Sequence, residues 1–374
     1  MAEKNRGSSD RFPSERRLLN QGAGAPVAGR SCGAVLEGDT VADVQKYFVQ
    51  FDEAIRFDRD VEKAALAEKR ERILRKLSEG IKRQRVEGTT IPSYEPFNQG
   101  SYAMNLGVKP IDGDFDLDVG LRFELSKADY PDPVVVKGWV HGALDGHTRK
   151  VEVRRSCVTV FYQEGGEDIY HVDLAIYSSG KRNADGKDYI AKGKPGQRAD
   201  ERRWEPSDPQ ELQNVILSGR SGEDAQQFRR VIRVLKRWKE LRLSPQHGRK
   251  APKGIALTVA AHHWFEVSVK KDVFGKTIGY DDLGALKSLV TQMLSRFETV
   301  WSAEERRSVV RLRILHPVSR DYDFCSNMSS ASMLGFKERL EALLAALNTA
   351  LGAQDPRAAC QALREQLGDD FPLP

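Results

Sequence analysis

Two carboxylates at alternate positions stand out in the segment FDLDVGLRF, residues 115–123. Successive side chains of a β-strand point to opposite faces, so Asp116 and Asp118 would share one face while the apolar residues share the other. Two close carboxylates repel each other and raise each other's pKa unless a cation or water lies between them. The pair therefore indicates a divalent-metal site, with a solvated strand face or a turn as the alternative.

A third aspartate, Asp173, lies in the apolar segment IYHVDLAIY, residues 169–177. Burying an aspartate in an apolar strand is costly without a partner, and a metal bound to a neighbouring D-x-D strand would supply one. Three carboxylates on two strands can hold two Mg²⁺ ions through oxygen ligands, the arrangement used for in-line displacement at phosphorus. We therefore predict a two-ion Mg²⁺ site, in which Mn²⁺ could substitute, with Asp114 as a second-choice ligand and His171 as a structural or cleft-lining residue.

A Gly-Ser pair, Gly100 and Ser101, precedes Asp116 by about fifteen residues. At the end of a strand or the start of a helix, such a pair can offer backbone N–H groups and a hydroxyl to a triphosphate. The pair alone carries little information. Its position ahead of the D-x-D pair and the third aspartate makes a nucleotide-binding interpretation much more specific.

Residues 224–241 are predicted to form a helix that places Lys236 near a cleft. At 100° per residue the apolar side chains form one arc and the basic ones the opposite arc, with Lys236 at the edge nearest Ile232. We interpret the other basic residues of this helix as facing either solvent or a partner.

The elements that must position these residues divide the chain into three predicted parts. Residues 1–38 are rich in small and polar residues and are predicted to be a disordered tail. Residues 39–208 are predicted to form the catalytic core, with a long helix over 60–84 and a mixed sheet, and residues 209–374 to form an all-helical lobe. The fold class is therefore α+β.

Three segments have the best strand patterns in the predicted sheet. They are residues 115–123, 151–162 and 169–177. These segments belong to a region of short alternating patterns bounded by Gly, Pro and Asp, which is typical of strands and turns.

The charge of the chain is unevenly distributed. Its 59 Lys and Arg exceed its 54 Asp and Glu by only five, but residues 229–253 carry ten Lys or Arg against one Glu. Such a basic stretch predicts a polyanionic partner, either a nucleoside triphosphate or nucleic acid. A solvated helix face is the alternative.

The composition excludes several classes of protein. No run approaches the roughly 18 to 20 apolar residues that cross a bilayer, so we expect no membrane partner. The basic N-terminus lacks the apolar core of a secretory signal. The four cysteines are far apart and form no CxxC pair, which argues against a disulfide framework or a zinc ribbon. We expect a cytoplasmic protein.

The motifs together resemble a known family. QGSYAMNLGVKPIDGDFDLDVGLRF and YHVDLAIY are similar to the catalytic core of polymerase-beta-like nucleotidyltransferases, and in particular to the bacterial cGAS/DncV-like (CD-NTase) enzymes of the CBASS antiphage systems. The resemblance extends over roughly residues 40–368. It implies a nucleotidyltransferase lobe followed by a helical lobe like that of oligoadenylate synthases.

The resemblance also implies roles for individual residues. Asp116, Asp118 and Asp173 match the catalytic, metal-binding aspartates, and Asp116 also belongs to the nucleotide-binding set. The other residues that match nucleotide-holding positions are Gln99, Gly100, Ser101 and Lys236. Relatives often have Ser where this chain has Gly254, so a hydroxyl contact to phosphate is an open question at that position.

The implied reaction is template-independent synthesis of a cyclic di- or oligonucleotide from nucleoside triphosphates, with ATP and GTP favoured. The product would activate a downstream antiphage effector. RNA or a regulatory protein is a further candidate partner. Two alternatives stay open: a linear nucleotidyltransferase, such as an oligoadenylate synthase or RNA-tailing enzyme, and a non-enzymatic nucleic-acid-binding protein that uses the basic stretch.

Overall fold

The computed structural model describes residues 41–57, 61–111, 115–164, 167–243 and 251–374. Residues 41–374 form one compact unit. The predicted tail, residues 1–38, lies outside the described residues, and so does the second-choice ligand Asp114.

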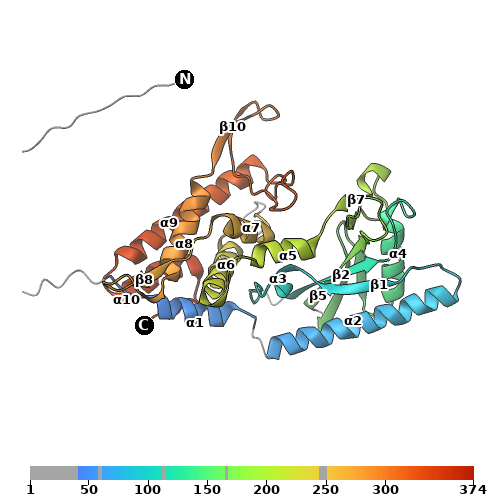
Figure 1. Cartoon of the computed structure of the whole chain (residues 1–374), viewed down its shortest axis with the longest axis horizontal. Helices are drawn as coiled ribbons and strands as arrows, with labels where there is room; N and C mark the ends of the chain where they lie inside the picture. Colours follow the sequence, from blue (N-terminus) through green and yellow to red (C-terminus); the bar gives the residue numbers. More distant parts are fainter. Residues whose placement is uncertain (1–40, 58–60, 112–114, 165–166, 244–250) are drawn as a thin grey trace, which may run out of the picture. The chain divides into compact units, whose positions relative to one another are not determined.

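The described helices precede, interrupt and follow the strands of the large sheet in the sequence (Figure 1). They are α1 (Gln45–Ile55), α2 (Val61–Val86), α3 (Gly100–Ala103), α4 (Pro133–Leu144), α5 (Pro209–Leu217), α6 (Gly222–Arg242), α7 (Gly254–Trp264), α8 (Asp282–Leu294), α9 (Ser330–Gly352) and α10 (Pro356–Leu367). A short 3-10 helix, η1, spans Ala199–Glu201.

The strands form one large sheet and two separate hairpins. The sheet strands are β1 (Tyr94–Asn98), β2 (Phe115–Phe123), β3 (Lys150–Val153), β4 (Val158–Glu164), β5 (Glu167–Ser178), β6 (Tyr189–Lys192) and β7 (Arg203–Pro206). The hairpins are β8 (Val269–Lys271) with β9 (Thr277–Tyr280), and β10 (Glu298–Ser302) with β11 (Arg307–Arg311). Both hairpins fall within the part predicted to be all-helical, which is therefore mainly helical instead.

The large sheet is mixed, which confirms the predicted α+β class. Its order is β1-β2-β5-β4-β3, with β6 paired to β5 and β7 to β6. Strands β2 and β5 run parallel, whereas β1 and β4 pair with them in antiparallel fashion. The two strands that carry the predicted aspartates are therefore direct neighbours.

Helices α2 and α4 pack with one face of this sheet. Alternate residues of β2 and β5 join apolar side chains of the two helices in one buried cluster. Examples are Leu117, Val119, Leu174, Leu77 and Val140. Because side chains alternate along a strand, burial of this face leaves the aspartates of β2 and β5 on the opposite face.

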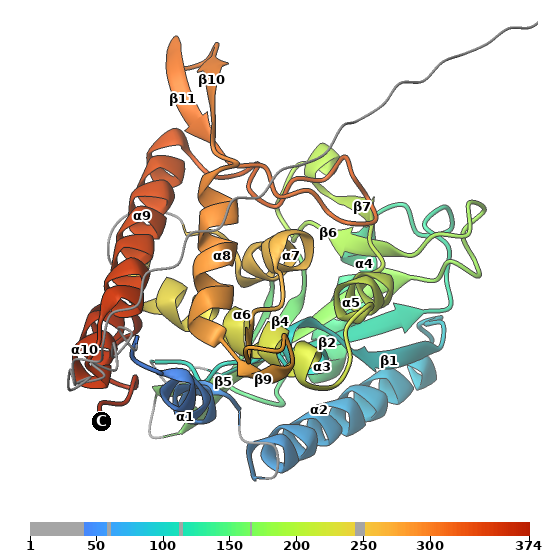
Figure 2. The same ribbon diagram turned by 60° about the vertical axis from the view of Figure 1, so that its left-hand side comes forward.

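A second buried cluster holds the C-terminal helices together (Figure 2). It contains apolar residues from α6 to α10, such as Leu235 and Leu343. Helix α1 belongs to this cluster through Phe48 and Phe51, although it precedes the sheet in the sequence. The boundary at residues 208 and 209 stays a prediction, but the two clusters show that α1 packs with the helical part.

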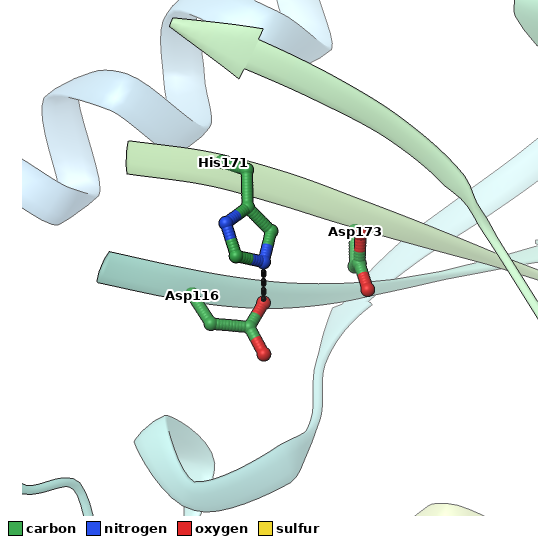
Figure 3. Close-up of side chains that lie close together, drawn as sticks. All are labelled: Asp116, His171 and Asp173. Atoms are coloured by element: carbon green, nitrogen blue, oxygen red, sulfur yellow. Dashed lines mark ion pairs between the residues drawn. The ribbon is translucent and has the colours of Figure 1, made fainter. Parts of the chain in front are cut away.

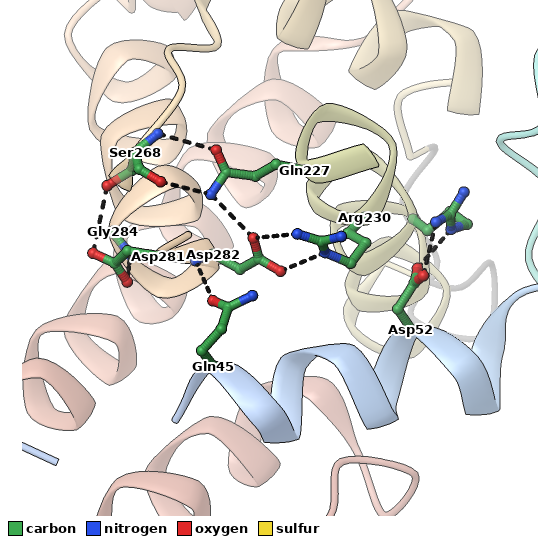
Figure 4. Close-up of polar contacts among 9 residues, drawn as sticks. Gln45, Asp52, Gln227, Arg230, Ser268, Asp281, Asp282 and Gly284 are labelled. Atoms are coloured by element: carbon green, nitrogen blue, oxygen red, sulfur yellow. Dashed lines mark hydrogen bonds and ion pairs between the residues drawn. The ribbon is translucent and has the colours of Figure 1, made fainter. Parts of the chain in front are cut away.

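Buried polar contacts also link α1, α6 and α8 (Figure 4). Arg230 of α6 donates to both carboxylate oxygens of Asp282, at 2.7 and 3.2 Å. Arg233 donates to both oxygens of Asp52 on α1, at 2.6 and 2.8 Å. Gln45 accepts a hydrogen bond from the backbone N–H of Asp282 at 2.8 Å. These contacts fix α6 between α1 and α8.

One predicted strand was wrong in its extent. The segment 151–162 is not a single strand, because it contains most of β3 and the first part of β4, which pair antiparallel. The turn between them is closed by a hydrogen bond from the N–H of Arg154 to the carbonyl of Cys157, at 3.0 Å. The predicted long helix, the helix that carries Lys236 and the two strands that carry the aspartates are confirmed as α2, α6, β2 and β5.

Across the described residues, no helix is both long and apolar enough to span a membrane.

Candidate metal and nucleotide site

The three predicted aspartates lie together on one face of the sheet. In the parallel pairing of β2 with β5, Asp118 is the register partner of Asp173, and Asp116 is the register partner of His171. Register partners on neighbouring strands point to the same face. The structure therefore brings together the carboxylates that the D-x-D and V-D-L patterns predicted.

The side chains of Asp116, His171 and Asp173 lie close together (Figure 3). His171 Nε2 lies 3.3 Å from Asp116 Oδ1. One ligand atom from each of Asp116, His171 and Asp173 lies within 4.8 Å of the other two. From the neighbouring strand β4, the hydroxyl of Thr159 donates a hydrogen bond of 2.5 Å to Asp173 Oδ1, which fixes the orientation of that carboxylate.

The carboxylates of the three aspartates repel one another. Burial raises the pKa of Asp118 to about 7, and the carboxylates of Asp116 and Asp173 act in the same direction. His171 and Lys236 oppose the rise without cancelling it. Since a nearby cation would restore the charged form, the site is better suited to a bound metal ion than to a set of bare carboxylates.

Gly100 leaves the space that Asp118 occupies. Its backbone has a φ of +71°, a conformation that favours glycine. A Cβ at this position would lie 2.1 Å from Oδ2 of Asp118. Gly100 opens α3 directly after β1, so the predicted strand-to-helix position of the Gly-Ser pair is confirmed.

A cavity of about 240 Å³ lies beside the carboxylates. Its lining includes Ser101, Asp116, Lys236, Lys239 and Gly254. The volume is below the roughly 300 Å³ at which pockets for whole small molecules begin, but the polar lining suits a triphosphate chain. The cavity thus joins the predicted phosphate-binding residues from α3 and α6 to Asp116, a predicted metal ligand.

Lys236 is held in position at this cavity. Its Nζ donates a hydrogen bond of 3.0 Å to the carbonyl of Leu106 in the loop after α3. Burial lowers the pKa of Lys236 to about 7, with Lys239 and Arg233 acting in the same direction. An anion beside the ammonium would reverse this effect, as expected of a residue that receives phosphate.

The residues fit a hard divalent cation. Three carboxylates offer the oxygen ligands that Mg²⁺ prefers, and Mn²⁺ accepts both carboxylate and imidazole ligands. The raised pKa of Asp118 points the same way, because the nearby basic side chains do not offset burial and the neighbouring carboxylates. His171 is placed to serve as a further ligand or to orient Asp116.

The sequence alone gives too little weight to two residues near the site. His171 was expected to have a structural or cleft-lining role, yet it lies within contact distance of a predicted ligand. Thr159 had no assigned role, although pairing β4 with β5 places it opposite Asp173. The signal in both cases is strand register, which a single sequence does not supply.

The remaining predicted site residues have different environments. Gln99 is buried, and its Oε1 accepts a hydrogen bond of 2.9 Å from the hydroxyl of Tyr177. Its side chain therefore supports the floor of the site. Gly254 begins α7 beside Lys236, and a Cβ there would meet only Lys236 Cε, at 3.7 Å.

The expectation that the other basic residues of α6 face solvent or a partner was wrong for the central arginines. Arg233 and Arg237 are each only 3% exposed. Arg230 and Arg233 are paired with aspartates of other helices, and Arg237 lies 3.2 Å from Glu240. These arginines stabilise the helical part, so they no longer support a nucleic-acid partner.

Comparisons with known proteins agree with this geometry. Residues 95–177 match the family described as "Cyclic GMP-AMP synthase DncV-like, nucleotidyltransferase domain". No curated protein is similar enough in sequence to count as a match.

Solved structures with the same fold include two bacterial proteins. The Vibrio cholerae DncV cyclic AMP-GMP synthase, in complex with the linear intermediate pppA(3',5')pG, has a TM-score of 0.59 at 15% identity over 87% of this chain and 96% of its own. E. coli MS115-1 CdnC with ATP has a TM-score of 0.60 at 13% identity over 87% of this chain and 98% of its own. The predicted resemblance is confirmed: residues 95–177 match the DncV-like nucleotidyltransferase domain, and the chain has the fold of these proteins over most of its length.

Proposed function

We propose that this protein is a magnesium-dependent, template-independent nucleotidyltransferase that makes a cyclic di- or oligonucleotide from nucleoside triphosphates, with ATP and GTP favoured. The observation that carries the proposal is the convergence of Asp116, Asp118 and Asp173 beside a cavity lined by Ser101 and Lys236. Carboxylates for metal and a lysine for phosphate are the parts that phosphoryl transfer requires.

Each part of the site has a separate task in this proposal. Asp116, Asp118 and Asp173 hold divalent cations, for which Mg²⁺ is the expected ion and Mn²⁺ a substitute. The chemistry that the bound ions supply is neutralisation of triphosphate charge and activation of a ribose hydroxyl. Thr159 keeps Asp173 oriented through their hydrogen bond.

The chain's own residues also orient the donor nucleotide. Ser101 and Lys236 receive its phosphates in the cavity, and Gly100 lets the backbone approach Asp118 without a clash. Gln99 supports this segment from beneath. The hydroxyl of a second nucleotide attacks the donor's α-phosphate in line, and pyrophosphate leaves. The free ribose hydroxyl of the linear product then attacks the α-phosphate of its own 5'-triphosphate, and a second pyrophosphate leaves as the ring closes.

The biological setting follows from the same proposal. The cyclic product would act as a second messenger that activates an antiphage effector, and the enzyme would work in the cytoplasm. The product and the intermediate named for DncV, a cyclic AMP-GMP and its linear precursor, support a cyclic dinucleotide as the first product to seek.

Product analysis tests the proposal. Purified protein with all four nucleoside triphosphates and Mg²⁺ should release pyrophosphate and give a phosphatase-resistant product whose mass identifies a cyclic nucleotide. An Asp116→Ala/Asp118→Ala variant should give none. Open-ended, phosphatase-sensitive products would favour the linear enzyme instead, and salt-dependent nucleic-acid binding without turnover would favour the binding protein.

A further inference from the structure

The hairpin of β8 and β9 ends in two exposed apolar side chains. Val273 and Phe274 are 93% and 91% exposed, more than any other large apolar side chain of the described residues. They occupy the two central positions of the turn, where Gly, Pro, Asn, Asp and Ser are usual. We call this pair the apolar tip. Since water solvates such side chains poorly and folding does not bury them, the apolar tip indicates a contact outside the chain.

The turn that carries the apolar tip is closed by its own hydrogen bonds. The N–H of Asp272 donates to the carbonyl of Lys276 at 2.9 Å, and the N–H of Gly275 donates to the carbonyl of Asp272 at 3.0 Å. The side-chain Oδ1 of Asp272 accepts from the N–H groups of Phe274 and Lys276, each at 2.9 Å. Four N–H groups are thus satisfied within the turn, and the apolar tip has a defined conformation.

The base of the hairpin is fixed to the helical part (Figure 4). Gln227 of α6 binds the backbone of Ser268 twice: its Oε1 accepts from the N–H at 3.0 Å, and its Nε2 donates to the carbonyl at 2.9 Å. The hydroxyl of Tyr280 on β9 donates to Asp224 Oδ1 at 2.7 Å. The helical part therefore supports a hairpin whose far end is the apolar tip.

Two lysines flank the apolar tip. Lys271 is the last residue of β8 and Lys276 directly precedes β9, and both are exposed. Neither forms an ion pair with another described residue, whereas Lys270 lies 2.6 Å from Asp43 Oδ1. The one carboxylate of the turn, on Asp272, accepts hydrogen bonds from backbone N–H groups. The end of the hairpin therefore combines apolar side chains with a net positive charge.

This combination suits the surface of an anionic lipid bilayer. Lysines there lie among the phosphate headgroups, while apolar side chains enter the acyl region below. Backbone N–H groups that leave water must have partners within the chain, and four of those in the turn have them. The centre of a protein interface is depleted in lysine, and each partner contributes about 800 Å², several times the area of two side chains. A lipid surface is therefore favoured over a protein partner.

We propose that the apolar tip inserts into the surface of an anionic bilayer, with Lys271 and Lys276 among the lipid headgroups. The contact goes beyond the proposed function, because it brings the enzyme to a membrane without entering the reaction. The expectation of no membrane partner rested on the lack of a spanning run, and a hairpin tip that enters only the surface does not need one. Two apolar side chains and two lysines give a weak and reversible contact.

Vesicle flotation without nucleotide tests the contact. The full-length protein is mixed with vesicles of phosphatidylcholine alone or of phosphatidylcholine and phosphatidylglycerol in equal parts. We expect the wild type to bind the anionic vesicles about tenfold or more tightly than the neutral ones. Val273→Ser/Phe274→Ser should lose about tenfold or more of this affinity. Lys271→Gln/Lys276→Gln should lose the preference for anionic vesicles.

Trp301→Ser is the matched control. Trp301 lies on the other hairpin, in β10, and is 69% exposed, so its replacement removes a large apolar side chain from a different surface. This variant should keep wild-type binding. All these variants change exposed side chains and should keep the wild-type melting temperature, so a loss of binding reports on the apolar tip itself. Equal binding by wild type and Val273→Ser/Phe274→Ser would overturn the inference.

The depth of the tip in the bilayer gives a second readout. Lipids with brominated acyl chains should quench the fluorescence of Phe274→Trp more strongly than that of the wild type, which has five tryptophans. Equal quenching would overturn insertion of the apolar tip. Absence of wild-type binding to both kinds of vesicle would also overturn the inference and favour a protein partner. Because flotation needs no turnover, a protein without nucleotidyl transfer would refute the proposed function and leave this inference intact.

Discussion

The basic residues of α6 differ from the acidic residues of β2 and β5 in how their charges are paired. On α6, Arg230 and Arg233 each have a carboxylate partner on another helix. On the sheet, Asp118 is largely removed from solvent beside Asp116 and Asp173, and its pKa rises as a result. Charges that are paired within the chain stabilise the fold. Carboxylates that repel one another instead mark the place where a bound cation would complete the site.

Lys236 shows the contrast within one helix. It lies three residues from Arg233, but its ammonium reaches a neutral carbonyl and the cavity rather than a carboxylate. The two residues also hold consecutive carbonyls, since Arg233 donates to Asn105 at 2.8 Å and Lys236 to Leu106. Arg233 thus stabilises the fold, whereas Lys236 is available to a substrate.

The largest expected effect is on activity at the acidic site. Asp118→Asn keeps the size of the side chain but removes its charge, so nucleotidyl transfer should fall about 10³-fold, the order expected for lost electrostatic stabilisation. Initial rates of pyrophosphate release measure this. Asp129→Asn, at an exposed aspartate between β2 and α4, is the control and should retain full activity. Equal rates for Asp118→Asn and wild type would show that Asp118 has no role in catalysis.

The next largest effect is on the free energy of unfolding, through the paired arginines of α6. Arg233→Met leaves Asp52 buried without its partner and should lower the free energy of unfolding by about 3 to 5 kcal/mol. Urea denaturation gives this value. Arg364→Met breaks a surface pair with Asp369, whose side chain is 98% exposed, and should cost at most about 1 kcal/mol. Similar losses in the two variants would contradict a structural role for Arg233.

A glycine pair separates local strain from damage to the site. Gly100→Ala and Gly88→Ala both place alanine at positive φ, but only at Gly100 would the Cβ meet Asp118. Each should lose about 1 kcal/mol of stability from the backbone conformation, and only Gly100→Ala should lose activity, by about 10²-fold. If Gly88→Ala lost as much activity as Gly100→Ala at equal stability, displacement of Asp118 would not explain the loss of activity in Gly100→Ala.

The smallest effect concerns Gly254. A serine there fits beside Lys236 Cε at 3.7 Å and presents a hydroxyl to the cavity. One neutral hydrogen bond to phosphate should lower the KM for the donor nucleotide about threefold. Gly254→Ala supplies the Cβ without the hydroxyl and should leave KM unchanged. Equal KM values for the two variants would mean that phosphate does not reach this part of the cavity.

The sequence predicted the site better than the surroundings of α6. Alternation within FDLDVGLRF sufficed to place Asp116 and Asp118 on one face, because strand periodicity is local. The apolar pattern around Asp173 indicated a partner on a neighbouring strand, and the parallel pairing of β2 with β5 supplies it. The partners of Arg230 and Arg233 could not be predicted, since Asp282 and Asp52 lie 52 and 181 residues away in the chain. The turn at Arg154 was missed because the segment around it has an unbroken strand-like pattern.

The role of His171 also depends on pairing between segments that are far apart in the chain. Its distance from Asp116 follows from the parallel register of β2 with β5, which composition and periodicity do not determine. The junction of β4 with β6 likewise brings together residues about forty positions apart, since the N–H of Gly193 donates to the carbonyl of Arg155. Long-range pairing is thus what the sequence alone could not supply, both for the fold and for the site.

The most direct test of the central claim, that the acidic site is completed by a metal ion, compares the stability of wild type and Asp118→Asn. A raised pKa means that the folded protein binds more protons than the unfolded chain between about pH 4 and pH 7, so wild-type stability should fall as pH rises through this range. Without metal at pH 8, Asp118→Asn should be more stable by about 1 to 3 kcal/mol, because one pKa unit corresponds to about 1.4 kcal/mol.

Addition of Mg²⁺ should reverse the order. Binding to the folded state alone stabilises the wild type by about 2.7 kcal/mol at a hundredfold excess over Kd, and the variant should gain much less. The measurement is the free energy of unfolding of both proteins at pH 4 and pH 8, with and without Mg²⁺. Equal stability of the two proteins at pH 8 without metal, together with equal gains on adding Mg²⁺, would contradict the account.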